Sequence, residues 1–100
     1  MLYFRALSLA ADFYRAAKVA PLKSDIKGQL IRAASSACLN LAEGRGRGTL
    51  KDQLRHFHIA MGSVRECQAV LIIEDLKDTD MWIKLHRSAA AVYRLIQRAR

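Results

Sequence analysis

The sequence predicts an all-α protein that folds as an antiparallel up-down-up-down four-helix bundle. Apolar residues recur at intervals of three and four along almost the whole chain, which is the helical period. One proline and five glycines in 100 residues provide too little punctuation for a many-stranded β fold. The connections between the periodic stretches are short, and short connections make neighbouring helices antiparallel. A chain of this length is expected to form one domain over residues 1–100.

The first helix is expected over residues 3–18, and Pro21 follows it. This stretch contains Asp12 and lacks a basic leader, so we interpret it as an amphipathic helix and not as a signal peptide. No apolar run reaches the ~18 residues that span a bilayer, which leads us to expect a cytoplasmic protein with no membrane partner. The predicted core stripe of this helix consists of Phe4, Leu7, Ala11 and Tyr14, with Ala10, Phe13 and Ala17 beside it.

The second helix is expected to begin at Ser24 as its N-cap and to end at Gly44, placed at the left-handed position that follows many helices. Its core stripe consists of Leu30, Ala34, Ala37 and Leu41. The third helix is expected to begin at Thr49, which forms a capping box with Asp52. Its core stripe consists of Leu50, Leu54, Phe57, Met61, Val64, Gln68 and Leu71.

The fourth helix is expected to begin at Asp78 or Thr79, since either side chain can cap it. The apolar residues then follow a regular three-and-four spacing to the end of the helix. They are Trp82, Leu85, Ala89, Val92, Ile96 and Ala99.

Positive charge dominates the composition. Lysine and arginine number 17 against nine acidic residues, giving a net charge of +8, and eleven of the 17 are arginine. Arginine presents a planar set of donors that suits bidentate contact with phosphate or carboxylate. RNA or DNA is therefore the first partner class that we consider, and an acidic protein surface is the alternative.

The antiparallel topology gathers much of this charge at one end. The start of the chain, the connection around residues 44–48 and the end of the chain should meet there, whereas several acidic residues cluster near residues 74–80 at the other end. We call the first end the basic pole and expect it to bind phosphates. Its cationic residues are Arg5, Arg45, Arg47, Lys51, Arg55, Arg94 and Arg98.

The stretch Gly44-Arg45-Gly46-Arg47-Gly48 could form a phosphate cradle, a disordered tract or a hinge. A dinucleotide fingerprint follows a strand, whereas this stretch follows a predicted helix and its third glycine is one residue early. No Gly-Lys-Ser or Gly-Lys-Thr is present, and five residues are too few for a disordered tract. We interpret the stretch as a tight reversal that directs its two arginines outward.

Polar residues within the helical stretches have a structural interpretation. Asn40, Glu43 and Glu66, together with Gln68, are expected to hydrogen-bond across the bundle and to fix its register. A second group lies on the outer face of the third helix, opposite Phe57, where small and β-branched residues favour contact with another copy. That predicted homo-oligomer interface consists of Ile59, Gly62, Ser63, Val70 and Ile73, and the alternative is isolated apolar residues on an ordinary surface.

The sequence predicts no enzyme, no cofactor and no metal site. His56 and His58 lie about 200° apart around a helix and cannot share one metal, so we interpret them as surface histidines beside the basic pole. Ser35 and Ser36 have no histidine nearby in the sequence to activate them. The two cysteines, Cys38 and Cys67, are expected to be buried free thiols.

Residues 29–76 resemble a known family. The patterns Leu-x-Arg-Ala-Ala-Ser, Asn-x-Ala-Glu-Gly-x-Gly-Arg and Phe-x-x-Ala-x-Gly-Ser-x-x-Glu are similar to those of the four-helix-bundle proteins named for ribosomal-RNA intervening sequences. The accessory variability determinant proteins of diversity-generating retroelements share that bundle type. The resemblance implies a ring-like homo-oligomer, a pentamer in characterised members. For the retroelement branch it implies binding of nucleic acid and of a partner reverse transcriptase; the alternative is a bundle encoded in an intervening sequence with no assigned role.

Overall fold

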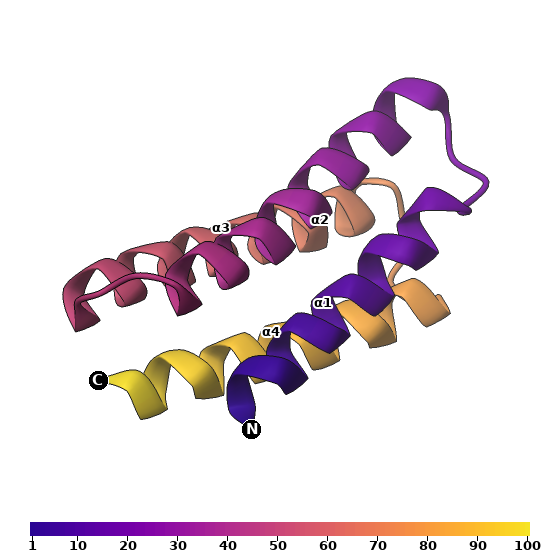
Figure 1. Cartoon of the computed structure of the whole chain (residues 1–100). Helices are drawn as coiled ribbons and strands as arrows, with labels where there is room; N and C mark the ends of the chain where they lie inside the picture. Colours follow the sequence, from indigo (N-terminus) through magenta and orange to yellow (C-terminus); the bar gives the residue numbers. More distant parts are fainter.

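Four helices and their short connections make up the chain, and the computed structural model describes all residues from 1 to 100. Each helix packs against two others: α1 and α3 each contact both α2 and α4, and diagonally opposite helices do not touch. The predicted four-helix bundle is therefore confirmed (Figure 1). The helices are α1 (Leu2–Lys18), α2 (Ser24–Arg45), α3 (Leu50–Ile73) and α4 (Asp80–Ala99).

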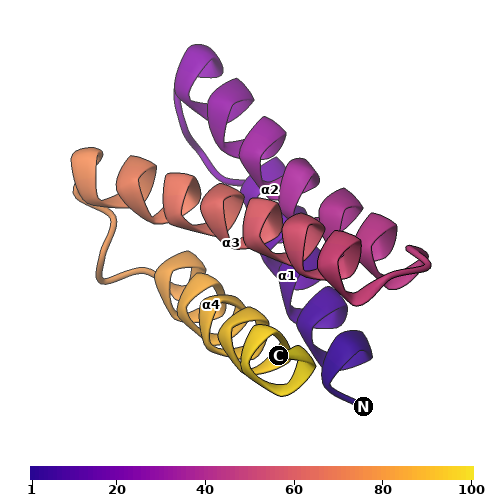
Figure 2. The same ribbon diagram turned by 90° about the vertical axis from the view of Figure 1, so that its left-hand side faces the viewer.

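Both chain ends and the α2–α3 connection lie at the same end of the bundle (Figure 1). Figure 2 looks onto that end. The α1–α2 and α3–α4 connections lie at the opposite end. None of the helices is both long and apolar enough to cross a membrane. The topology thus places the basic pole where the sequence predicts it.

The core is divided along the bundle axis into two clusters. The cluster at the basic pole is built around Leu41, Phe57 and Val92. The cluster toward the other end is built around Phe13 and Leu85 and includes a run of small α2 residues. Because α2 contributes mainly alanines, the neighbouring helices can approach it closely.

The predicted core stripe of α1 is wrong by one residue. Phe4, the first member of the predicted stripe, is 57% exposed, whereas Tyr3 is 7% exposed. The apolar arc of this helix is too wide to fix its rotation, because residues on both candidate stripes are apolar. The buried residues of α1 are Tyr3, Ala6, Ala10, Phe13 and Ala17.

The predicted stripe of α3 also needs correction. Leu50 is 51% exposed, and the buried arc is turned toward α2. That arc includes Ala60 and Ser63, which the sequence pattern did not place in the core, and Cys67, which is buried as predicted. The stripes predicted for α2 and α4 are largely confirmed, since all four α2 residues and the central four α4 residues are buried.

Threonine caps begin two of the helices as predicted. Thr49 Oγ1 accepts from the backbone N–H of Asp52 at 3.2 Å, and Thr79 Oγ1 accepts from the N–H of Trp82 at 3.3 Å. The capping role predicted for Ser24 is wrong: Lys23 is the extended N-cap residue, and Ser24 is already helical. A residue that has helical backbone angles cannot point its hydroxyl back at the first turn's free N–H groups in the N-cap manner.

The role predicted for Gly44 is also wrong. Gly44 is a buried residue inside α2, the helix ends at Arg45, and no glycine has a positive φ. A Cβ atom at Gly44 would lie 2.7 Å from Cε1 of Phe57 and 3.1 Å from the carbonyl oxygen of Gln53. The absence of a side chain therefore lets α2 and α3 approach each other at the basic pole.

The left-handed residue of this fold is Asp75, with φ of 60°. It follows α3, where the N–H of Leu76 donates to Leu71 O at 2.8 Å and the N–H of Asp75 donates to Ile72 O at 3.1 Å. These two bonds form a Schellman motif, which satisfies carbonyls at the helix end. An aspartate tolerates the left-handed conformation better than most residues do.

Candidate nucleic-acid interface

Arg45 connects the end of α2 to the start of α1. Its guanidinium carbon lies 5.1 Å from the ring centroid of Tyr3 and 5.9 Å from that of Phe4. The two rings meet edge to face, with centroids 5.0 Å apart. Cation–π contacts of this kind hold the arginine in place by about 0.5–1 kcal/mol at an exposed position. An exposed aromatic ring and an exposed cation therefore lie together at the basic pole.

A hollow of about 260 Å³ opens beside this arginine, between the start of α1, the α2–α3 connection and the end of α4. Tyr3 and Phe57 line it, and two guanidinium groups, from Arg45 and Arg98, stand at it. Gln53 also lines it and donates its amide N–H to Arg47 O at 3.0 Å. The two arginines of the hollow suit a phosphate, whereas its two rings are buried and leave little face for a base to stack on.

The cations of the basic pole differ in whether a carboxylate neutralises them. Arg47 is paired with Glu43, and Arg55 lies 3.9 Å from a carboxylate oxygen of Asp52. The other five have no acidic partner within 4.0 Å, since the only remaining ion pair of the chain joins Arg15 and Asp12. Those five, which we call the free cations, are Arg5, Arg45, Lys51, Arg94 and Arg98; all five residues are exposed.

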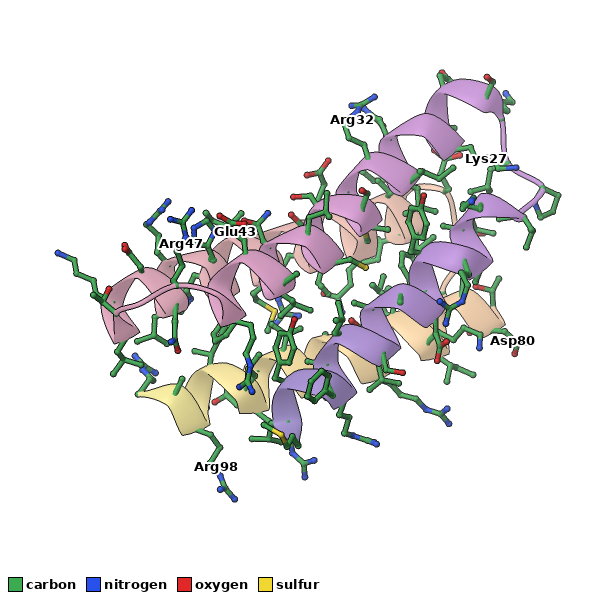
Figure 3. The ribbon with its side chains drawn as sticks, in the orientation of Figure 1. Lys27, Arg32, Glu43, Arg47, Asp80 and Arg98 are labelled. Carbon is green, nitrogen blue, oxygen red and sulfur yellow. The ribbon has the colours of Figure 1, made fainter.

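The predicted phosphate contacts do not form one flat surface. Figure 3 shows Arg47 beside Glu43 on one side of the pole and Arg98 pointing away on the other. Of the free cations, Arg45 and Arg98 line the hollow. The far end of the bundle carries both signs, as Lys27 and Asp80 illustrate (Figure 3). The seven cations of the basic pole thus outnumber the carboxylates that pair with them, which are those of Glu43 and Asp52.

Asn40 makes the cross-bundle contact predicted for it. Its Nδ2 donates to Ser36 O at 2.9 Å, which turns Oδ1 toward Nδ1 of His56 on α3, 3.1 Å away. That arrangement places a proton on Nδ1 of His56, so that Nε2 can accept from Arg55 at 3.2 Å. Further along the same seam, Ser63 donates to Ser36 at 2.9 Å. This polar network joins α2 to α3.

The other polar predictions need correction. Glu43 forms an ion pair with Arg47, four residues later in the chain, and does not reach across the bundle. Glu66 is exposed and has no hydrogen bond to another helix, and Gln68 accepts from Arg65 of the same helix at 2.8 Å. His56, interpreted as a surface histidine, is 8% exposed. It is buried because α3 is turned toward α2, whereas His58 remains exposed.

The predicted oligomer stripe is only partly on the surface. Ile59 is 41% exposed, Ile73 is 76% exposed, and nothing lies within 4 Å of a Cβ position at Gly62. Val70 is half-buried and packs against the core cluster of Phe13 and Leu85. Ser63 is not on the outer face at all, since it lies in the α2–α3 seam.

Both cysteines are free thiols. Cys67 is buried, and its Sγ lies 3.9 Å from Leu30 O. Burial raises the pKa of Cys67 to about 12, and burial also raises the pKa of Cys38, against a smaller lowering by Arg15. No three histidine, cysteine and acidic side chains gather closely enough to hold a metal ion.

Sequence reasoning missed the aromatic part of the pole. Phe4 is predicted only as a core residue and Tyr3 is assigned no role, although both directly precede Arg5 in the sequence. An aromatic pair beside an arginine at a charged end is a signal that could have identified them. The juxtaposition of Arg45 with both rings could not be found from local sequence, because it joins residues more than 40 positions apart.

Comparison with known proteins gives one match. The family model described as "23S rRNA-intervening sequence protein" matches residues 1–98, well beyond the stretch that carries the resemblance in the sequence. No curated protein and no solved structure matches.

Proposed function

The chain belongs to the 23S rRNA-intervening sequence protein family, and on that premise we propose that it is a non-enzymatic nucleic-acid-binding protein whose basic pole holds phosphates. The observation that carries this proposal is the set of five free cations at one end of the bundle, where Arg45 lies over the exposed ring of Phe4. Cations without carboxylate partners exchange only counterions and water when a phosphate arrives, which makes binding electrostatic and salt-dependent.

The aromatic rings favour nucleic acid over an acidic protein surface. Phe4 is 57% exposed and lies beneath Arg45. An unpaired base can stack on such a ring, whereas a carboxylate side chain has no face to stack. The chain is accordingly proposed to bind RNA or DNA by backbone contacts and stacking, without strong sequence preference.

The protein is further proposed to act as a homo-oligomer, a ring of the pentameric type implied by the family resemblance. Support comes from the exposed part of α3, where Ile59 and Ile73 flank the open space at Gly62. Exposed apolar residues beside a glycine allow close approach of a second helix. Light scattering at micromolar concentration tests this: a multiple of 11.2 kDa is expected, and a monomeric mass would contradict it.

A narrower role beside a reverse transcriptase rests on the resemblance to the retroelement accessory proteins. A reverse transcriptase gene and a template repeat next to the gene for this chain would support that role. Co-purification of the two proteins then provides the direct test. A gene inside a ribosomal-RNA intervening sequence would instead favour the other branch.

The nucleic-acid proposal is tested by two substitutions of equal charge change on one helix. Arg45→Glu alters a free cation at the basic pole, and Arg32→Glu alters an exposed arginine farther along α2 (Figure 3). We expect Arg45→Glu to weaken binding of a labelled oligonucleotide at least tenfold at ~50 mM salt and Arg32→Glu to weaken it less than threefold. Equal effects, with unchanged helicity, would show that only net charge matters.

A further inference from the structure

Four hollows of the surface follow one another along α4, and each shares lining residues with the next. The first two share His86 and Ala90, the second and third share Tyr93 and Arg94, and Arg98 links the third to the hollow at the basic pole. Their volumes, from the start of α4 to its end, are about 410, 430, 360 and 260 Å³. We call this series of hollows the α4 track.

The α4 track is uniformly cationic. No aspartate or glutamate lines any part of it. Five arginines do, and none of them has a carboxylate within 4.0 Å. They come from three helices and are Arg45, Arg65, Arg87, Arg94 and Arg98.

Aromatic side chains are interleaved with these cations. Trp82 lies in the first hollow, with its ring centroid 5.3 Å from that of His86. Tyr93 is 56% exposed and lies where the second and third hollows meet. Tyr3 also lines the last hollow but is 7% exposed, so the rings open to a base are those of Trp82 and Tyr93. Rings alternating with cations match alternating bases and phosphates of an unpaired strand.

A polar group in the middle of the track remains available to a ligand. Gln68 is 8% exposed, and its Oε1 accepts from Arg65 at 2.8 Å. Its amide nitrogen has no partner within the chain and therefore keeps its donors for a base edge or a phosphate.

We infer that the α4 track binds a single strand of nucleic acid that runs from the basic pole toward the start of α4. This inference rests on the proposed function and names its substrate class, since a base paired inside a duplex cannot stack on Trp82 or Tyr93. The 20 residues of α4 span about 30 Å, the length of about nine stacked nucleotides. Arg87, Arg94 and Arg98 then stand about 10 and 6 Å apart along the axis, two or three nucleotide steps.

The test compares labelled single strands of four and twelve nucleotides with a twelve-base-pair duplex, by fluorescence anisotropy at ~50 mM salt. The full-length protein should bind the single-stranded twelve-mer at least tenfold more tightly than the four-mer and more tightly than the duplex. A duplex that binds as tightly as the single strand would overturn the inference.

Two variants locate the strand. Arg87→Ser and Tyr93→Ala, both at exposed positions, should each weaken twelve-mer binding at least fivefold while changing four-mer binding less than twofold. Lys84→Ser is the matched control, because Lys84 is exposed on α4 and lines none of the hollows. If Arg87→Ser and Lys84→Ser weaken twelve-mer binding equally, the inference that the strand follows the α4 track is overturned.

The outcomes separate this inference from the proposed function. If the four-mer binds and Arg45→Glu abolishes its binding while the track variants have no effect, the basic pole stands and the α4 track fails. If no oligonucleotide binds and a poly-glutamate peptide binds in a manner sensitive to Arg87→Ser, both fail and the acidic-protein alternative takes their place.

Discussion

Gly44 shows how a single missing side chain shapes the basic pole. It lies in helical backbone against the ring of Phe57, which is 3% exposed. A helical position would ordinarily favour alanine over glycine by about 1 kcal/mol. Here the added methyl group would overlap a buried ring, so steric overlap outweighs propensity.

We therefore predict that Gly44→Ala destabilises the protein by about 1–3 kcal/mol in urea denaturation. Gly28→Ala is the control in the same helix, because nothing lies within 4 Å of its Cβ position. That control should be neutral or stabilising by up to about 1 kcal/mol. A neutral Gly44→Ala would contradict the close α2–α3 approach.

Cys67 provides a residue-scale prediction about reactivity. Its pKa is raised to about 12 by burial, so at pH 8 the native thiolate fraction is about a thousandfold below that of a thiol with the ordinary value of 9.0. In a Cys38→Ser variant, we expect the remaining thiol to react with a disulfide reagent at least a hundredfold more slowly in buffer than in urea. Equal rates would show that Cys67 is accessible.

The raised pKa of Cys67 also determines whether the stability of the fold rises or falls with pH. The pKa of Cys67 is higher in the folded protein than in the unfolded chain. The contribution of the protonated thiol to stability is therefore fully present below pH 9.0 and is lost as the pH rises toward 12. The free energy of unfolding should therefore fall over that range. A Cys67→Ala variant should lose less of its stability over the same pH range.

At the scale of elements, the seam between α2 and α3 depends on a polar pair. Asn40→Ala would leave Nδ1 of His56 without a partner at a buried position. We predict a loss of about 1–3 kcal/mol, compared with less than about 0.5 kcal/mol for Gln29→Ala at an exposed α2 position. In a double-mutant cycle, His56→Leu should lower the free energy of unfolding less in the Asn40→Ala variant than in the unaltered protein. Additive effects would contradict a direct bond.

How far the sequence predicts each element depends on how narrow its apolar arc is. α4 has polar residues on its outer face, so Leu85, Val92 and Ile96 were placed correctly in the core. α1 is apolar on several sides, and its rotation was set only by contact with α2 and α4. The charges of the basic pole followed from topology, whereas the α4 track needed Arg65 of α3 beside Tyr93 of α4, a pairing that no local pattern contains.

At the scale of the whole molecule, arginine and lysine side chains without carboxylate partners are concentrated at the basic pole and along the α4 track. The basic pole holds five free cations. The α4 track shares three of them, Arg45, Arg94 and Arg98, and adds Arg65 and Arg87. The topology brings these charges to one end and one side, because both chain ends and the α2–α3 connection meet there (Figure 1).

The salt dependence of binding tests this claim most directly. For a single-stranded oligonucleotide, each neutralised phosphate contributes about −0.7 to the slope of log K against log salt, so five to seven cations predict a slope of about −3 to −5. Arg45→Glu should make that slope shallower. A slope near zero, or no binding at ~50 mM salt, would contradict the claim that free arginines of this bundle hold a nucleic-acid backbone.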